Sequence, residues 1–440
     1  FPGKVLAIDY SLPSGLYCEI REVQSKEDGT DRVYFATDEE LAAIKERMQQ
    51  IIDADLPFRK VKMNYEEAQK LFTANGQKGK VNLMNSVKRF TYSVYFLDGK
   101  ADTFHGPLTV STGVLNTFDI IGFNDGFCLQ YPMDGSSGKV LPLKRQSKIA
   151  KALEEHSDWC AIMGVKGVGA LNKAVLDGSI VDLINLSEAL HERKYAEIAN
   201  QIYARRGAIK IVFIAGPSSS GKTSTSKRLA LQCRILGMNP KVIELDNYFV
   251  NREDTPRDEN GEYDFECIGA VDTDFFNQQM NALLEGKEVE LPRYDFPTGK
   301  RVFEGRKLRI NPEDIIILEG NHALNPILTQ QIPEEKKFRI YVSPLTTIQL
   351  DDHNYIHTID IRLLRRILRD YKYRGYSASE TIRRCPSVKA GEEKWIIPFQ
   401  ELADATFNSA LLYELGVIRA QVLPILEKVS ERDVEYAEAH

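Results

Sequence analysis

The 440-residue sequence lacks several features that would place it in a simple class. Its six cysteines are scattered without a CxxC pair, which argues against a disulfide framework and favours reduced thiols in a cytoplasm. No apolar run approaches the length of a membrane span, and the first residues show no signal-peptide pattern. A net charge of -6 gives no general attraction to nucleic acid or membranes. The chain is long enough for two or three domains with real cores.

One short stretch carries the clearest chemistry. IVFIAGPSSSGKTSTSKRLA, residues 211–230, predicts a buried strand, a loop and a helix, and the loop matches the phosphate-binding pattern GxxxxGK[ST]. Glycines let several backbone N–H groups point at one anion, and the helix start adds its positive dipole end. Lys222 can reach the outer phosphates, and the Thr223 hydroxyl can bind Mg²⁺. We therefore predict a site for ATP and Mg²⁺, with nucleotide contacts from Gly216, Ser218, Ser219, Ser220, Gly221, Lys222, Thr223 and Ser224.

Two carboxylates directly follow predicted strands. Asp246 comes after an apolar run that ends at Leu245, and Glu319 follows the apolar residues 315–318. Ligands of open parallel sheets bind at the carboxyl ends of the strands, so both acids should lie near the phosphate loop. Asp246 could accept a proton from an acceptor hydroxyl or help to orient Mg²⁺, and Glu319 could hold the metal or its water. The alternatives are a turn cap at Asp246 and a solvated charge at Glu319.

A basic helix is predicted further along the chain. IRLLRRILRDYKYRG, residues 361–375, has apolar residues at helical spacing and the arginines Arg362, Arg365, Arg366, Arg369 and Arg374. Guanidinium groups on one side of this helix could neutralise the charge of a transferring phosphoryl group. The alternative is a solvated basic face.

The order of the elements predicts the fold class. Strands alternate with helices from residue 208 onward, which predicts a P-loop NTPase-type parallel sheet with helices on both faces. We expect an α+β domain at residues 1–140, a helical connector at 141–207 and the kinase-like domain at 208–440. The polar segment 251–266 is long enough for a substrate loop. His353 and His357 would share a helix face as zinc ligands do, although an ordinary histidine pair is the simpler interpretation.

Taken together, these motifs make residues 209–430 resemble the uridine/cytidine kinase family, within the group that includes phosphoribulokinase. The resemblance implies that Asp246 in DNYF activates a ribose 5′-hydroxyl and that Glu319 in LEG binds Mg²⁺. It also implies substrate contacts from DNYF, YDFE and PRYDF, which supply Tyr248, Asp264, Glu266 and Tyr294. The motif RRILRD matches the family's lid helix, which makes Arg366, Arg369 and Arg374 catalytic candidates beside Lys222.

The sequence departs from that family where the base is bound. The family's pyrimidine-contacting histidine falls near Gly299, and a glutamine and an arginine beyond the lid are replaced by Arg384 and Tyr376. We keep Arg301 and Arg384 as candidate substrate contacts. The sequence therefore leaves open whether the acceptor is a purine nucleoside or another hydroxylated compound. One alternative is a kinase for a sugar or polyol, such as ribulose phosphate or pantothenate, since Arg293, Lys300 and Arg301 could bind a phosphorylated acceptor. The other is an RNA-binding protein switched by a nucleotide.

The first 140 residues resemble a different family. FPGKVLAIDYSLPSGLYCEI, the helix ending in ADLPF, and HGPLTVSTGVLNTFDIIGF are similar to the second N-terminal domain of threonyl-tRNA synthetase, which edits mischarged tRNA. The Cys and His of that family's C-R-G-P-H motif align with Phe104 and Leu108, so editing is not predicted. The fusion resembles a bacterial nucleoside kinase type. We expect a nucleoside substrate, no membrane, tRNA contact only through this domain, and a homo-oligomer.

Overall fold

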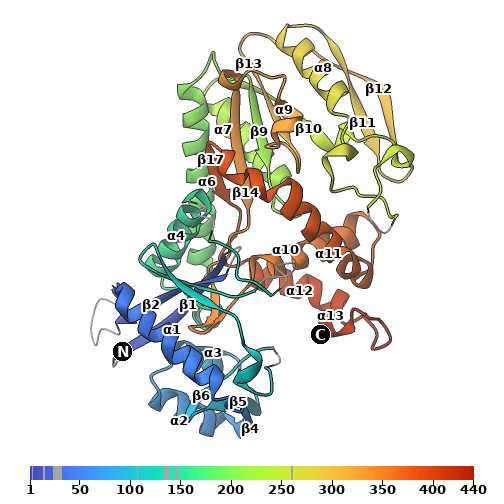
Figure 1. Ribbon diagram of the computed structural model, residues 1–440. Coiled ribbons are helices and arrows are strands. Elements are labelled where there is room, and N and C mark those ends of the chain that lie inside the picture. The colour runs from blue at the N-terminus through green and yellow to red at the C-terminus, as the bar shows by residue number, and fades with distance from the viewer. Residues whose placement is uncertain are drawn as a thin grey trace. The chain divides into compact units, whose positions relative to one another are not determined.

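The computed structural model describes residues 1, 3–12, 15–22, 32–106, 108–132, 138–143, 147–258 and 261–440. Pro13 of the N-terminal motif and residues 259–260 of the predicted substrate loop lie outside the described residues. The chain forms two compact units, coloured along the sequence in Figure 1. Unit 1 comprises Phe1–Gln146, Leu153–Ile184 and Thr346–Thr358, and unit 2 comprises Ser147–Ala152, Asn185–Leu345 and Ile359–His440. Residues of the expected helical connector are thus shared between both units.

Unit 2 is built on a five-stranded parallel sheet in the order β10-β13-β9-β14-β17. Its strands are β9 (Ile211–Ala215), β10 (Asn239–Glu244), β13 (Asp314–Glu319), β14 (Lys337–Ser343) and β17 (Ala405–Asn408). Every residue of β9 and β13 is buried. Central strands of a parallel sheet are covered on both faces, which explains their continuous apolar runs. The predicted parallel α/β sheet is confirmed.

Helices pack around this sheet (Figure 1), and three of them form a second core. Leu229 and Cys233 of α7 pack with Val212 and Ile214 of β9 in the sheet core. The basic helix α10 instead buries Ile367 in a separate core with α11 and α12. The helices are α7 (Lys222–Ile235), α8 (Thr273–Leu284), α9 (Pro326–Thr329), α10 (Thr358–Tyr373), α11 (Ala378–Trp395), α12 (Glu414–Leu426) and α13 (Tyr436–Ala439). The antiparallel hairpin β11 (Val289–Asp295) and β12 (Lys300–Leu308) completes the unit, with short 3-10 turns at η2 (Leu245–Tyr248), η3 (Arg252–Asp254), η4 (Ile268–Ala270), η5 (Glu334–Lys336) and η6 (Ile397–Leu402).

Unit 1 is an α+β region, as predicted, and the strands of its described residues pair antiparallel. The first sheet contains β1 (Lys4–Leu12), β2 (Gly15–Glu22), β3 (Arg32–Tyr34), β7 (Asp119–Phe123) and β8 (Gly126–Gln130), and the second contains β4 (Arg59–Asn64), β5 (Thr91–Leu97) and β6 (Lys100–Asp102). The predicted turn between β5 and β6 has positive φ at Asp98 (47°) and Gly99 (75°), as a tight hairpin requires. The helices of this region are α1 (Asp38–Asp53), α2 (Tyr65–Ala74), α3 (Lys78–Ser86), η1 (Thr112–Val114) and α5 (Val168–Asp177), while α4 (Ser147–Ile162) and α6 (Ile180–Ala204) contribute residues to both units.

The predicted amphipathic helix at the start of the chain is α1. Thr37 forms a capping box with Glu40, as its position before the apolar pattern suggests, and Leu41 is buried. No helix of the described residues is long and apolar enough to cross a membrane. All six cysteines are free thiols.

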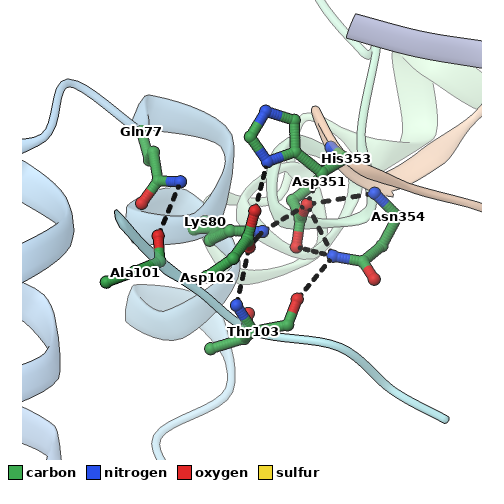
Figure 2. Close-up of polar contacts among 8 residues, drawn as sticks. All are labelled: Gln77, Lys80, Ala101, Asp102, Thr103, Asp351, His353 and Asn354. Atoms are coloured by element: carbon green, nitrogen blue, oxygen red, sulfur yellow. Dashed lines mark hydrogen bonds and ion pairs between the residues drawn. The ribbon is translucent and has the colours of Figure 1, made fainter. Parts of the chain in front are cut away.

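A buried charged cluster joins the hairpin β15 (Gln349–Asp351) and β16 (Asn354–Tyr355) to the rest of unit 1 (Figure 2). Lys80 Nζ lies 2.6 Å from Asp102 Oδ1 and 2.8 Å from Asp351 Oδ1. His353 Nδ1 lies 2.5 Å from Asp102 Oδ2, and Asn354 Nδ2 donates to Thr103 O at 3.0 Å. The side chains of Lys80 and Asp351 are only 3% and 1% exposed, so each depends on the other for its charge to be compensated.

The same contacts argue against zinc binding by His353 and His357. His353 pairs with Asp102, whereas His357 Nε2 lies 2.7 Å from the Tyr355 hydroxyl, and the two histidines do not share a helix face. Among the described residues there is no group of three or more potential ligands that could hold a metal ion.

Replacing Lys80 by Met should destabilise unit 1 by about 3–5 kcal/mol, because the buried carboxylate of Asp351 would lose its cation and Asp102 would lose one of its partners. Thermal or urea denaturation, together with hydrogen exchange across residues 59–103 and 346–358, measures this. Lys78→Met, on the exposed start of the same helix, is the matched control and should stay within about 0.5 kcal/mol of the parent. Equal stability of the two variants would contradict the assignment.

Candidate active site

The phosphate-binding loop connects β9 to α7. A Cβ on Gly216 would lie 2.0 Å from Val342 O, so only glycine fits where the loop crosses β14. Ser219 adopts φ 60°, an uncommon conformation that turns the backbone toward the helix. The hydroxyl oxygens of Ser219 and Ser220 are buried and have no partner among the described residues. Unpaired hydroxyls at a helix start suit a ligand rich in acceptor oxygens, such as a nucleotide phosphate.

Lys222 connects this loop to the predicted acids. Its Nζ donates to Gly216 O at 3.0 Å and Pro217 O at 3.1 Å. Burial lowers the pKa of Lys222, and the negative charges of Glu319 and Asp246 partly oppose that shift. Both carboxylates therefore act on the same ammonium group, which is the grouping that the sequence predicted.

Strand register explains why these residues meet. Glu319 ends β13, opposite Ile214 of β9 and Glu244 of β10. Asp246 lies two residues beyond the end of β10, in the turn η2. The loop, Glu319 and Asp246 therefore all leave the sheet at its carboxyl edge, where parallel sheets bind ligands.

Thr223 and Glu319 provide a pair of oxygen ligands for a hard cation. Thr223 Oγ1 donates to Glu319 Oε1 at 2.5 Å. Burial raises the pKa of Glu319, while the positive charge of Lys222 and the Thr223 hydrogen bond act in the opposite direction. A hydroxyl and a carboxylate beside a phosphate loop fit Mg²⁺, which binds through oxygen ligands and keeps several waters.

Three of the predicted arginines converge on a carboxylate that sequence reasoning missed. Asp370 is 3% exposed and accepts from Arg369 Nε at 2.9 Å and from Arg366 Nε at 3.4 Å. Arg374 Nη1 lies 3.8 Å from the same carboxylate. Arg369 Nη1 also donates to Ser218 Oγ at 3.3 Å, which places the cluster beside the phosphate loop. Asp370 stands one residue after Arg369 and four after Arg366, and this helical spacing was the available signal.

The other two arginines of α10 contact backbone carbonyls in and beside the phosphate-binding loop and pair with carboxylates of other helices. Arg362 Nε donates to Ser218 O at 3.2 Å, and its Nη2 pairs with Glu392. Glu392 Oε1 accepts from the backbone N–H of Ser218 at 2.9 Å. Arg365 pairs with Glu414 and donates to Ser409 O at 2.8 Å. Sequence reasoning missed Glu392, because two adjacent acidic residues within a helix are typical of a solvent-exposed face.

Glu266 and His322 lie close enough to Lys222 for its charge to act on both. Glu266 Oε2 accepts from Asn321 Nδ2 at 3.3 Å, and burial raises the pKa of Glu266, against the positive charge of Arg366. Asp264 Oδ1 accepts from the N–H of Glu266, so it caps this turn. His322 was not predicted: burial, assisted by Lys222, lowers its pKa to about 4, and its Nδ1 has no partner in the described chain. It is therefore neutral at pH 7.

An aromatic cluster stands next to Asp246. The ring of Tyr294 lies 5.6 Å from that of Phe249 and 5.2 Å from that of Phe296, both edge to face. The backbone N–H of Tyr294 donates to Asn247 Oδ1 at 3.1 Å, so the hairpin is fastened to the residue after Asp246. The guanidinium of Arg374 lies 5.6 Å from the Phe296 ring. The structure thus places the predicted Tyr294 beside the turn that carries Asp246.

Three predicted substrate contacts are placed elsewhere. Tyr248 is wholly buried, packs edge-on against Phe276 and donates its hydroxyl to Gln279 Oε1 at 2.9 Å, so it belongs to the core. The turn η2 directs Tyr248 inward, and the next residue, Phe249, joins the aromatic cluster instead.

The two candidate arginines outside the lid helix also have other contacts. Arg301 pairs with Asp272 at 2.9 Å and stacks on Phe275 at 4.6 Å. Arg384 is exposed and stacks on Tyr376 at 4.7 Å. Neither shares a hydrogen bond or ion pair with the described residues around Lys222.

These features define the class of site. A glycine-rich anion loop, a buried lysine, a hydroxyl–carboxylate pair and clustered arginines at one edge of a parallel sheet are the parts of a P-loop phosphotransferase.

Residues 211–412 match the model of the "Phosphoribulokinase / Uridine kinase family". The chain is 30% identical over 193 residues to a uridine kinase of Halobacterium salinarum, covering 43% of this chain and 76% of that relative. It is 31% identical over 195 residues to a uridine kinase of Ligilactobacillus salivarius, covering 44% of this chain and 82% of that relative.

The chain therefore belongs to the phosphoribulokinase / uridine kinase family, and it is an enzyme of the phosphotransferase class. The family match lies within the C-terminal half, at residues 211–412. The resemblance of residues 1–140 to a threonyl-tRNA synthetase domain stays a prediction.

Replacing Glu319 by Gln should weaken the apparent affinity for Mg²⁺ at least about tenfold, because the carboxylate charge is removed from the metal-binding pair. Titrating Mg²⁺ into the protein with a fluorescent ATP analogue measures it. Glu244→Gln alters the exposed neighbour on β10 that pairs with Glu319 in register, and it should change the affinity less than twofold. An unchanged Mg²⁺ affinity in the Glu319 variant would refute this assignment.

Proposed function

We propose that this protein is an ATP- and Mg²⁺-dependent nucleoside kinase that phosphorylates the ribose 5′-hydroxyl in the cytoplasm. The observation that carries the proposal is the grouping of Lys222, Asp246 and Glu319 at one sheet edge beside an aromatic cluster. Relatives that are described as uridine kinases support a nucleoside acceptor.

The chain's own residues supply positioning and charge. The loop amides and Lys222 would bind the β- and γ-phosphates, and Thr223 and Glu319 would hold Mg²⁺, which neutralises phosphate charge when bound. Asp246 would accept the proton of the 5′-hydroxyl as its oxygen forms a bond to the γ-phosphorus and the bond to the bridging oxygen breaks. The cluster of Arg366, Arg369 and Arg374 would stabilise the negative charge that passes to ADP.

The acceptor would lie between Asp246 and the aromatic cluster. Glu266 is suited to accept hydrogen bonds from the ribose hydroxyls, and Asp264 would act through the turn that it caps. The rings of Phe249, Tyr294 and Phe296 provide apolar faces against which a planar base can stack.

The ion pairs of the hairpin disfavour a phosphorylated sugar as the acceptor. Arg293 lies 2.7 Å from Glu304 and 3.5 Å from Asp295, and Arg301 pairs with Asp272. These two arginines share their charge with acids, so they attract a second phosphate less than unpaired arginines would. Lys300, the third candidate cation, makes no ion pair among the described residues. Contact with tRNA through residues 1–140 and self-association stay predictions.

Replacing Asp246 by Asn should lower kcat by about 10²–10⁴-fold while ATP binding stays nearly intact, because the proton acceptor is lost but the phosphate loop is unchanged. Steady-state ADP release with a nucleoside panel gives kcat, and a fluorescent ATP analogue gives the affinity. Asp254→Asn, an exposed change eight residues further along the chain at the end of η3, should leave both values unaltered. Unchanged turnover in the Asp246 variant would overturn this mechanism.

Protonation of Glu319 should also set the pH at which activity declines on the acid side. Its raised pKa means that it takes up a proton at a higher pH than an ordinary glutamate, whose pKa is about 4.3. Because the metal needs the ionised form, activity should fall as pH decreases through a midpoint above that value. More Mg²⁺ should move this midpoint to lower pH, since metal and proton compete. A midpoint that does not respond to Mg²⁺ would assign the acid limb to another group.

A further inference from the structure

We propose that Arg252 binds the base of the acceptor and that the preferred acceptor is a 6-oxopurine nucleoside, such as guanosine or inosine. This inference rests on the proposed function, because it names the substrate class of that same site.

Arg252 is fastened to the hairpin that carries the aromatic cluster. Its backbone N–H donates to Gly299 O at 2.8 Å, and the N–H of Arg301 donates to Asn251 Oδ1 at 3.1 Å. Gly299 has φ +69°, and a Cβ there would lie 2.7 Å from Arg252 Nε and 2.9 Å from its Cζ. The guanidinium of Arg252 therefore occupies the space that a side chain at position 299 would fill.

The guanidinium lies next to the aromatic cluster. Arg252 Nη2 donates to the carbonyl of Phe296 at 2.6 Å. Its positive charge also acts on the Tyr294 hydroxyl, where it opposes the rise in pKa that burial causes. The group thus stands at the edge of the surface against which a base would stack.

Arg252 keeps most of its hydrogen-bonding capacity. A guanidinium has five N–H donors, and within the described chain the side chain of Arg252 makes one hydrogen bond and no ion pair. Its neighbours differ, since Arg293 and Arg301 are paired with carboxylates. Arg252, in η3 beside the hairpin, therefore has donors next to the aromatic cluster that are free among the described residues and suited to a ligand.

The geometry of the donors selects among bases. Two parallel N–H groups of arginine match two adjacent acceptors, which guanine and hypoxanthine present at O6 and N7. Adenine places an amino donor at the same edge, and cytosine has its amino group at the edge away from the ribose, so that its adjacent acceptors, N3 and O2, lie nearer the ribose. Uracil offers O4 beside a carbon, so it can accept only one of the two bonds. The expected order is guanosine and inosine first, uridine next, then adenosine and cytidine.

The test compares kcat/KM across these five nucleosides by ADP release in the full-length protein, its Arg252→Met variant and an Arg257→Met control. Arg257 lies in the same loop, but it donates to Gly261 O and stacks on Tyr263. Losing the bidentate contact should lower kcat/KM about tenfold or more for guanosine and inosine, with little change for adenosine and cytidine. The Arg257 control should keep the parent order.

Two further measurements hold even if Arg252→Met folds poorly. The parent enzyme should lose about tenfold in kcat/KM when 7-deazaguanosine replaces guanosine, because N7 is missing. Arg252→Lys keeps the charge but lacks the planar fork, so it should lose the 6-oxopurine preference while staying active.

The outcomes separate the two proposals. Phosphorylation of nucleosides without a 6-oxopurine preference, or a preference that survives in Arg252→Met, would overturn the role of Arg252 and leave the kinase proposal standing. A parent enzyme that phosphorylates none of the five nucleosides would overturn both.

Discussion

The pairing of β9 with β13 is the constraint on which the site depends. This pairing sets Glu319 opposite Ile214, near the point where the chain leaves β9 for the phosphate loop. The first turn of α7 then brings the Thr223 hydroxyl to 2.5 Å from Glu319. A shift of one residue in this register would turn Glu319 to the other face of the sheet and separate the pair. Full burial of both strands makes such a shift costly.

Burial of Lys222 links that register to the rest of the site. An ammonium group in a desolvated position is destabilised unless nearby carboxylates compensate it, and here Glu319, Asp246 and Glu392 do so. Those acids come from β13, from the turn after β10 and from α11. The same principle holds in α10, where Asp370 keeps three guanidinium groups close together and leaves the cluster with excess positive charge. Phosphate groups are the natural complement to such an excess.

Sequence reasoning succeeded where covalent spacing alone fixes the geometry. An apolar run, a glycine-rich loop and a helix start must follow one another, so the positions of Lys222 and Thr223 were predictable. The acids at strand ends were predictable for the same reason. Glu392 and His322 were missed, because their roles come from contacts between segments that nothing in the chain's local pattern connects. Asp370 was missed although its helical spacing from Arg366 was visible in the sequence.

Two further differences have causes of opposite kinds, one local and one between distant residues. Tyr248 and Phe249 are adjacent aromatics, and the choice of which one faces the core is made by a single short 3-10 turn. The hairpin β15–β16 follows β14 in sequence yet belongs to unit 1, through the ion pair between Lys80 and Asp351. Composition gives no sign of a charge pair between residues so far apart along the chain.

The donor and acceptor sides of the site differ in how firmly their charges are fixed. On the donor side, Arg362 and Arg365 already have carboxylate partners that hold the phosphate loop in place. Substitutions there would disturb phosphate binding for any acceptor, so this half can change little without loss of the reaction. On the acceptor side, aromatic faces and the side chain of Arg252 lie on a hairpin and a loop outside the parallel sheet. That half can change its substrate while the sheet edge, and the phosphoryl transfer it supports, stays the same.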